Sequence, residues 1–256
     1  MFTTNPFASL TAFVSPEFMQ GYVVLMALAV VVGTLFDLLH EKKLAFFLQE
    51  RRRARAAASH PLGAAEKAAI LASTVAKDIA TFGEFCNRRR RISHALMFYG
   101  FVAYLATTVV LVFGYPAEPN PPAVLPLLWN LGAVMTLVGG YWFFFFLRVN
   151  VVHDGHPPWK LVRADLFIVT LLASVSFALL FEWAAIAGSA MAARVCAMFY
   201  VIFTTLLFGS VPWSKFAHMF YKPAMAFQKR VEEADGSSDL PTPTVRGGER
   251  CPPSRT

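Results

Sequence analysis

Two histidines at the ends of apolar runs have the residue type and spacing best suited to chemistry in this sequence. His94 lies just inside an apolar run that follows four consecutive arginines at 88–91, and His218 follows the last apolar run. A histidine at such a boundary costs free energy to bury, so we expect it to be paired, solvated or bound to a ligand. Two neutral imidazoles on neighbouring helices form the ligand set of a six-coordinate haem. The alternative is that both histidines form hydrogen bonds with lipid headgroups or backbone.

The other four histidines give weaker signals. His153 and His156 lie three residues apart in a polar segment, where they either bind a metal or are simply solvated. His40 closes the first apolar run and His60 lies in a long polar segment, and neither has an evident partner in the sequence.

Composition places the chain among membrane proteins. Of its 256 residues, 56% are hydrophobic and only 15% are charged, and the mean hydropathy is +0.51. A soluble domain of this size rarely carries so much apolar surface. The net charge of +7 is gathered between apolar runs, which is typical of membrane topology and not of nucleic-acid binding. The three cysteines are too scattered for an iron–sulfur cluster motif or a disulfide framework: Cys86, Cys196 and Cys251.

Five apolar runs reach the length of about 20 residues that a helix needs to span a bilayer. They predict an all-α bundle with spans at 18–39, 92–114, 123–147, 165–187 and 191–213, the last two joined as an antiparallel pair. Segment 40–91 holds twelve Lys and Arg residues and the chain from 215 onward holds seven, whereas 115–122 and 188–190 hold none. The positive-inside rule therefore predicts an outside N-terminus and a cytoplasmic C-terminus, in a multi-pass protein of the bacterial inner membrane.

Three parts of the chain flank or interrupt this bundle. Residues 1–17 contain no Lys or Arg and are expected to form an outer N-terminal segment. The membrane domain is expected at 18–230, and its first helix is expected to be retained. In the long loop 40–91, apolar residues at loosely helical spacing predict an amphipathic helix over 63–85. That helix either lies on the membrane or meets a partner, or it packs on its own bundle. The polar, Pro- and Gly-rich residues 231–256 are expected to form a disordered cytoplasmic tail.

Four segments carry a resemblance to a known family. They are Arg-Arg-Ile-Ser-His-Ala-Leu-Met-Phe-Tyr-Gly-Phe at 90–101, Asn-Leu-Gly at 130–132, the glycine pair at 139–140, and Pro-Trp-Ser-Lys-Phe-Ala-His at 212–218. They resemble the five-span cytochrome b family of the respiratory nitrate reductase gamma subunit, over roughly residues 18–225. Within it they are similar to the sulfur-metabolism branch, the membrane subunits of the quinone-interacting oxidoreductase type. The size of the chain resembles the small membrane anchor of adenylylsulfate reductase.

The resemblance implies a specific set of ligands. In the family, the second span carries two histidine ligands ten residues apart and the last span two that are eighteen apart, and these hold two haems b. Here His94 and His218 match one ligand pair, whereas Tyr104 and Tyr200 stand at the positions of the other pair. The paired replacement implies that one haem b remains, near the cytoplasmic face. Ten helical residues, from His94 to Tyr104, rise about 15 Å, and eighteen, from Tyr200 to His218, rise about 27 Å. The two ligand pairs therefore lie at matching depths only if a helix tilts or breaks, as near Pro212.

Two functions follow as expectations. In the first, the protein is a membrane subunit that passes electrons between a cytoplasmic iron–sulfur or flavin partner and membrane quinone through a single haem b. In the second, it is a haem-free membrane anchor that docks the soluble enzyme. The resemblance implies a soluble cytoplasmic oxidoreductase as the partner, with adenylylsulfate reductase as the type, and lipid and quinone in the membrane; nucleic acid is not expected. A transporter is a third, weaker reading, because the spans contain few ionisable groups.

The replaced ligand pair is also a candidate quinone site. If Tyr104 and Tyr200 occupy the place of a lost haem, phenylalanine-rich packing either closes it or leaves an apolar cavity. In such a cavity the two hydroxyls would donate hydrogen bonds to the carbonyl groups of a quinone.

Two carboxylates and a group of glycines have both structural and functional readings. Glu182, near the outer end of the fourth span, either exchanges protons with quinone or is a boundary carboxylate in water beside Trp183. Asp165 is read as a helix-start carboxylate with Arg163 as its cationic neighbour. Small residues in the third span allow close approach of either a neighbouring helix or a macrocycle: Gly132, Gly139 and Gly140.

Overall fold

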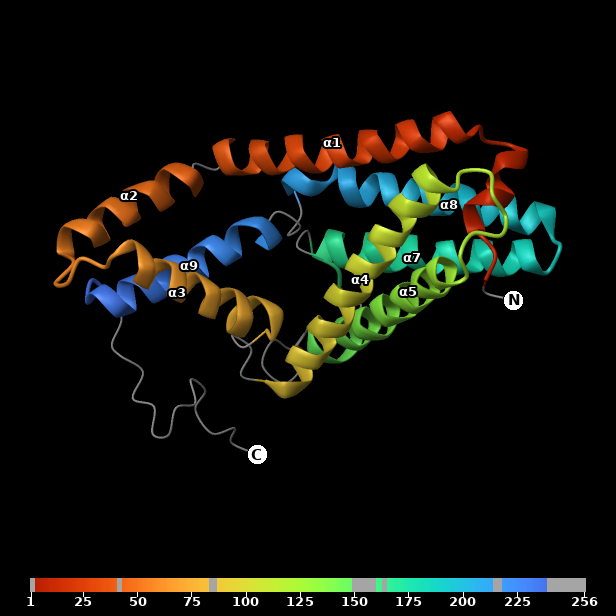
Figure 1. Ribbon diagram of the computed structural model, residues 1–256. Coiled ribbons are helices and arrows are strands. Elements are labelled where there is room, and N and C mark those ends of the chain that lie inside the picture. Colours follow the sequence, from red (N-terminus) through yellow and green to blue (C-terminus); the bar gives the residue numbers. More distant parts are fainter. Residues whose placement is uncertain are drawn as a thin grey trace. The chain divides into compact units, whose positions relative to one another are not determined.

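The computed structural model describes residues 3–40, 43–82, 87–148, 160–162, 165–213 and 218–238. Every regular element within these residues is a helix (Figure 1). The chain forms two compact units. The first unit comprises Met1–Thr34 and Ile92–Lys215, and the second comprises Leu35–Arg91 and Phe216–Thr256.

Among the described residues, five helices are long and apolar enough to cross a membrane, so the chain is a multi-pass membrane protein. The predicted all-α class is confirmed. The five predicted spans are also confirmed, and most of their ends agree with the helix ends to within a few residues. The helices are α1 (Pro16–His40), α4 (Arg88–Gly114), α5 (Val124–Trp142) with the π-helical turn η3 (Phe143–Leu147), α7 (Leu166–Ile186) and α8 (Ala190–Gly209). The orientation of the spans in the membrane stays a prediction.

The end of α8 differs from the prediction. The helix ends at Gly209, and the 3₁₀ turn η5 (Val211–Trp213) follows it, although the apolar run continues to residue 213. Pro212 explains the early end, because proline lacks the N–H that an α-helix needs and its ring collides with the carbonyl one turn earlier. Hydropathy follows apolar side chains, whereas the helix end is set by backbone chemistry.

Glycines in α5 allow α4 and α7 to approach it closely. A Cβ atom added at Gly132 would lie 2.6 Å from the backbone nitrogen of Tyr104, and one at Gly139 would lie 2.7 Å from that of Met97. A Cβ at Gly140 would lie 2.6 Å from Cδ2 of Leu172 on α7. Of the two readings of these glycines, contact with neighbouring helices is therefore the one that the structure shows.

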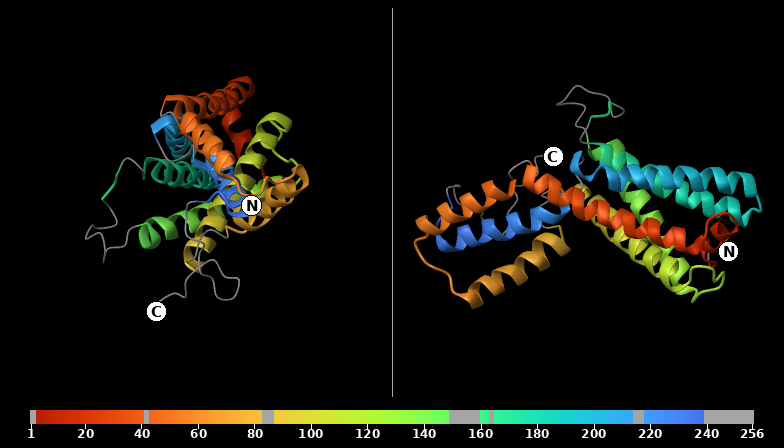
Figure 2. Two further views of the ribbon diagram at one scale, coloured as in Figure 1. Left: turned by 90° about the vertical axis from the view of Figure 1, so that its left-hand side faces the viewer. Right: turned by 90° about the horizontal axis from the view of Figure 1, so that it is seen from above.

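The predicted antiparallel pair is confirmed. Helices α7 and α8 pack along each other, as both Figure 1 and Figure 2 show. Gly188, with φ of 74°, turns the chain in the short link between them, a conformation in which residues with a side chain are strained.

The N-terminal segment is attached to the connection between α4 and α5. Asn5 caps the 3₁₀ helix η1 (Pro6–Ala12) by accepting a hydrogen bond from the backbone N–H of Phe7, at 3.0 Å. Its side-chain amide donates to the carbonyl oxygens of Tyr115 at 2.7 Å and Glu118 at 3.2 Å. The N-terminal segment and the turn at 115–122 therefore lie at the same end of the first unit.

The second unit combines the long loop with the C-terminal segment. It contains α2 (Lys43–Ala57), α3 (Ala64–Thr74), the π-helical segment η2 (Val75–Ala80) and α9 (His218–Asp235). The predicted amphipathic helix over 63–85 is observed as α3 and η2; residues 83–86 lie outside the described residues. The Glu66 carboxylate accepts from the N–H of Gly63 at 2.7 Å and fixes the start of α3. Helix α3 packs against α9, so one face of the predicted amphipathic helix contacts another helix of the same protein.

Helix α9 continues beyond the expected start of the tail. It reaches Asp235, whereas the tail was expected to begin at residue 231. The carbonyl oxygen of Asp235 accepts from the backbone N–H groups of Ser59 at 3.0 Å and His60 at 3.2 Å, which joins this helix end to the segment between α2 and α3. Residues 239–256 lie outside the described residues.

Candidate functional site

The two tyrosines singled out in the sequence, Tyr104 and Tyr200, meet inside the first unit. The hydroxyl of Tyr104, on α4, donates a hydrogen bond to the hydroxyl of Tyr200, on α8, at 3.1 Å. Tyr104 is buried, with 5% of its surface exposed. Its ring lies 5.1 Å from that of Trp129, which is fully buried and donates from Nε1 to Thr108 Oγ1 at 2.9 Å. The sequence predicted that these tyrosines share a site, and the structure brings them together.

Further hydrogen bonds near this pair join α8 to its neighbours. Tyr22 of α1 lies 2.9 Å from Thr205 Oγ1 and donates to the carbonyl of Val201 at 3.1 Å. Ser174 of α7 and Thr204 of α8 lie 2.7 Å apart and are buried. The Ser174–Thr204 contact satisfies two buried hydroxyl groups inside an apolar bundle, whereas the contacts of Tyr22 are exposed. At the tyrosine pair the structure thus shows packing; a quinone role for the pair stays a prediction.

His94 lies ten residues before Tyr104 on the same helix and is half-buried. Its ring meets the ring of Phe143 edge to face, with centroids 4.9 Å apart. Phe143 begins the π-helical turn η3 at the end of α5. The neighbouring Ser93 is fully buried and donates to the carbonyl of Gly139 at 2.8 Å, so a close helix contact fixes the backbone at His94.

His218 is the first residue of α9, in the second unit. The sequence predicted it at the end of the fifth span, and this was wrong, because α8 ends at Gly209 and Pro212 lies in the following turn. The pairing of His218 with His94 stays a prediction.

Other candidate ligands give no metal centre in the described part of the chain, where no three His, Cys, Asp or Glu residues form a group that could hold a metal ion. His153 and His156, considered as metal ligands, lie outside the described residues. His40 stacks on Phe36, with ring centroids 4.9 Å apart.

A buried carboxyl–amide pair was not predicted. Glu182 of α7 is only 2% exposed and accepts a hydrogen bond from Nδ2 of Asn130, on α5, at 2.9 Å. The reading of Glu182 as a carboxylate in water is therefore wrong, although its neighbour Trp183 is 62% exposed. The sequence did contain a signal for this pair, because Glu182 and Asn130 are polar residues in two apolar spans and such residues usually pair inside a membrane.

Asp165 stands at the start of α7, as predicted, and has a partner that was not predicted. Asp165 forms an ion pair with Arg148, in which both side chains are buried, and its carboxylate accepts from the N–H of Val162 at 3.0 Å. Arg163 lies outside the described residues. The π-helical turn before Arg148 sets the position of the guanidinium group, which also lies 4.5 Å from the centre of the Phe144 ring. A π turn leaves no clear mark in the sequence, so the pairing with Arg148 could not be predicted.

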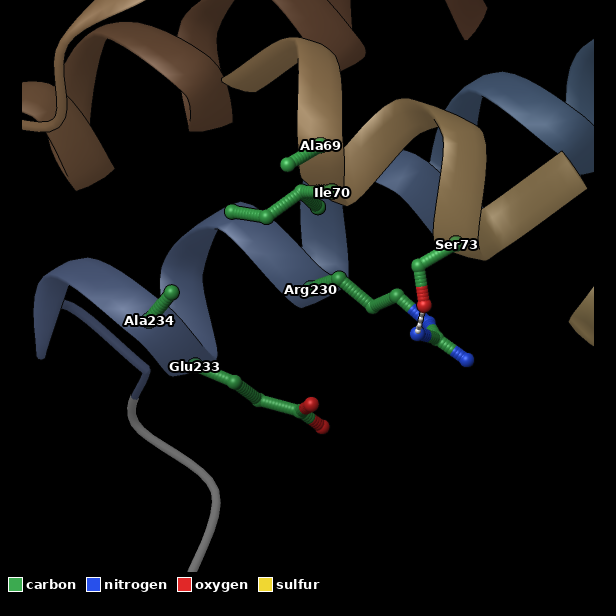
Figure 3. A pocket seen from close by; sticks show the side chains of 6 residues that line it. All are labelled: Ala69, Ile70, Ser73, Arg230, Glu233 and Ala234. Atoms are coloured by element: carbon green, nitrogen blue, oxygen red, sulfur yellow. Dashed lines mark hydrogen bonds between the residues drawn. The ribbon is translucent and has the colours of Figure 1, made fainter. Parts of the chain in front are cut away.

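The second unit has an open pocket of about 420 Å³ between α3 and α9. Figure 3 shows Arg230 reaching from α9 toward α3, where its Nη1 donates to Ser73 Oγ at 2.9 Å. None of the four predicted site residues lines this pocket, which is formed by Ala69, Ile70, Ser73, Arg230, Glu233 and Ala234.

Comparison with protein-family models, curated proteins and solved structures gave no match for this chain.

Proposed function

We propose that this protein is the membrane subunit of an oxidoreductase complex in the bacterial inner membrane, and that it passes electrons between membrane quinone and a soluble cytoplasmic partner. A single haem b is the carrier, with His94 and His218 as its axial ligands. The partner supplies the iron–sulfur clusters or flavin, because three scattered cysteines cannot hold a cluster. Adenylylsulfate reductase is the type of partner that the motif resemblance suggests.

One observation supports this proposal: α8 ends nine residues before His218, so the spacing of a continuous helix does not apply to this ligand pair. His94 lies ten residues from Tyr104, a rise of about 15 Å along α4. Helix α8 ends nine residues after Tyr200, a rise of about 13 Å, and the chain then leaves the helix at η5. A continuous helix would instead raise His218 by about 27 Å from Tyr200. His94 and the end of α8 therefore lie at similar distances along their helices from the tyrosine pair.

The tyrosine pair supports a single haem. Tyr104 and Tyr200 stand where the resemblance places the ligands of a second haem, and their hydroxyls are hydrogen-bonded to each other at 3.1 Å. Two phenol groups are an implausible ligand set for a low-spin haem. The close packing of Tyr104 with Trp129 further disfavours a macrocycle at this level.

The position of the His94 imidazole is suitable for a haem ligand. Its imidazole is half-buried at one end of a membrane span, and the Ser93 hydrogen bond to α5 fixes the backbone next to it. A haem bound there would supply a one-electron carrier between the quinone pool and the partner. The protein's own contribution would be to hold the two imidazoles in place and to keep apolar side chains such as Phe143 around the ring.

The test is an optical spectrum of the purified protein, reduced minus oxidised, with haem quantified per chain. We expect one haem b for each chain. Replacing His94 or His218 with alanine should abolish the reduced α-band. The matched control is His60→Ala, because His60 is exposed and only its backbone N–H is used, in a bond to Asp235.

Three outcomes would contradict parts of this proposal. An unchanged spectrum in the His94→Ala variant would remove this residue as a ligand. Two haems per chain would contradict the reading of the tyrosine pair. A wild-type protein that copurifies with its oxidoreductase but contains no haem would establish the anchor function instead.

A further inference from the structure

Helix α2 combines exposed apolar side chains with an unusually dense group of arginines. Its first half exposes large apolar residues: Leu44 is 41% exposed, Phe46 64% and Leu48 41%. Its second half exposes arginines at 51, 52, 53 and 55. The two kinds of residue are separated along the helix axis rather than around it, because the basic and apolar positions each occupy several faces.

The described chain leaves most of α2 exposed, although Phe47, Glu50 and Ala54 are half-buried. Extensive contacts in the second unit join α3, η2 and α9, and α2 takes no part in them. Arg53 forms an exposed ion pair with Glu50 at 2.8 Å, which contributes little to stability. Among the described residues, no partner is observed for the guanidinium groups of Arg51, Arg52 and Arg55. Exposed phenylalanine and unpaired arginine together indicate a surface that another phase or molecule covers.

The chain itself indicates what covers it. Helix α1, which is long and apolar enough to span a membrane, ends at His40, and α2 begins at Lys43. Three residue steps reach about 10 Å at most, so the start of α2 must lie close to the end of a membrane span. A helix in that place meets the headgroup region, where apolar side chains insert and arginines bind phosphate groups.

We propose that α2 is an interfacial helix that binds anionic phospholipid headgroups, through Arg51, Arg52 and Arg55, with Leu44, Phe46 and Leu48 inserted beside them. The ligand is a lipid surface rather than an acidic protein, because the exposed apolar half directly follows a span. This inference does not depend on the haem.

Hydrogen exchange of the full-length protein in lipid nanodiscs tests it. The amides of 44–57 should exchange more slowly in discs of phosphatidylcholine mixed with phosphatidylglycerol than in phosphatidylcholine alone. Each arginine near an anionic surface contributes about fivefold to binding, so replacing Arg51, Arg52 and Arg55 with glutamine should remove most of the added protection. Glutamine retains helix propensity, so the helix itself should survive.

The matched control replaces Lys67 and Lys77, two exposed bases of α3 and η2, with glutamine. This variant should keep the protection that phosphatidylglycerol gives to α2. A second variant, Phe46→Ser, should lower protection of α2 in both lipid mixtures. Because haem absorbance is measured on the same samples, failure of this inference is distinguishable from failure of the proposed function.

Three results would overturn the inference. Equal exchange of α2 in both lipid mixtures would exclude headgroup binding. Protection that survives the triple arginine replacement would assign the contact to apolar residues alone. Protection that appears only when the soluble oxidoreductase is added would show that α2 docks a protein.

Discussion

A hydrogen bond between the side-chain hydroxyls of buried Tyr104 and half-buried Tyr200 joins α4 to α8. Replacing one tyrosine with phenylalanine removes one hydroxyl and leaves the other without its partner. Each single variant should therefore lower the free energy of unfolding in detergent by about 1–3 kcal/mol. The double variant should cost less than the sum, because it leaves no buried hydroxyl unpaired.

Thermal or denaturant unfolding of the four proteins in this double-mutant cycle measures the coupling. Strictly additive losses would mean that the two hydroxyls do not interact. The same variants test the quinone hypothesis, which needs the hydroxyls for the carbonyl groups of the ring. Normal quinone-linked electron transfer in both single variants would leave the pair as packing only and place the quinone site elsewhere.

A second buried contact, between Glu182 and Asn130, ties α7 to α5. Glu182→Gln retains a side-chain oxygen that accepts from Asn130 Nδ2, so its effect on unfolding should be small. Glu182→Ala removes the acceptor and leaves the buried amide of Asn130 with only the carbonyl of Pro126, at 3.1 Å. We expect a loss of about 1–3 kcal/mol. Equal stability of the two variants would show that this hydrogen bond does not hold the helices together.

At the level of single residues, the sequence could identify candidates but not their partners. The resemblance to a known family was enough to predict that Tyr104 and Tyr200 share a level. Glu182 was assigned wrongly, because its neighbour Trp183 suggested a watery boundary, and the pairing of Asp165 with Arg148 was not predicted. Their partners, Asn130 and Arg148, come from other helices, and helix rotation decides those contacts.

Among the helices, the approach of α4 to α5 depends most on residue size. Gly139→Ala would place a methyl group 2.7 Å from the Met97 nitrogen and from the Ser93 oxygen, both backbone atoms that cannot move without shifting α4. We expect this variant to lose roughly 1–3 kcal/mol of stability. It should also perturb His94, since Ser93 donates to the carbonyl of Gly139.

The control for this prediction is Gly21→Ala on α1, where an added Cβ meets nothing within 4 Å. Alanine has the higher helix propensity, so this variant should be neutral or slightly more stable. The comparison is made by thermal unfolding in the same detergent. Similar losses in both variants would point to backbone effects rather than to helix contact.

Helix positions were predictable where apolar length determines them. The five spans follow from hydropathy because about 20 apolar residues in a row have few other solutions. Helix α2 was not predicted, although its residues 43–57 include no Gly or Pro and many helix formers. The π-helical turn η3 and the end of α8 depend on local backbone geometry, which hydropathy does not report.

For the whole molecule, the partnership between the long loop and the C-terminal segment was beyond sequence reasoning. Helices α3 and α9 are more than 130 residues apart in the chain, yet they pack against each other. Arg230 and Ser73 form one polar link between them. The periodicity of each helix marks a face that packs but does not say which distant helix packs on it.

Orientation in the membrane is a property of the whole chain. The segment 40–91 carries twelve Lys and Arg residues, whereas the turn 115–122 carries none, and this asymmetry predicts a cytoplasmic loop 40–91. The hydrogen bonds from Asn5 to the carbonyls of Tyr115 and Glu118 place the N-terminal segment at the same end as that turn. If the turn lies outside, the N-terminal segment must lie outside too.

Cysteine labelling in intact spheroplasts tests this orientation. A membrane-impermeant maleimide should label Ala117→Cys, because Ala117 is exposed in the 115–122 turn. The native Cys251 should react only after the membrane is permeabilised, since the sequence predicts a cytoplasmic C-terminus. Cys86 and Cys196 are replaced with serine in both proteins, and Cys251 also in the Ala117→Cys protein, so that each protein carries one reactive cysteine. Labelling of Cys251 without permeabilisation would reverse the orientation and place the basic loop, the two histidines and the arginines of α2 on the outer side, where a cytoplasmic oxidoreductase could not reach them.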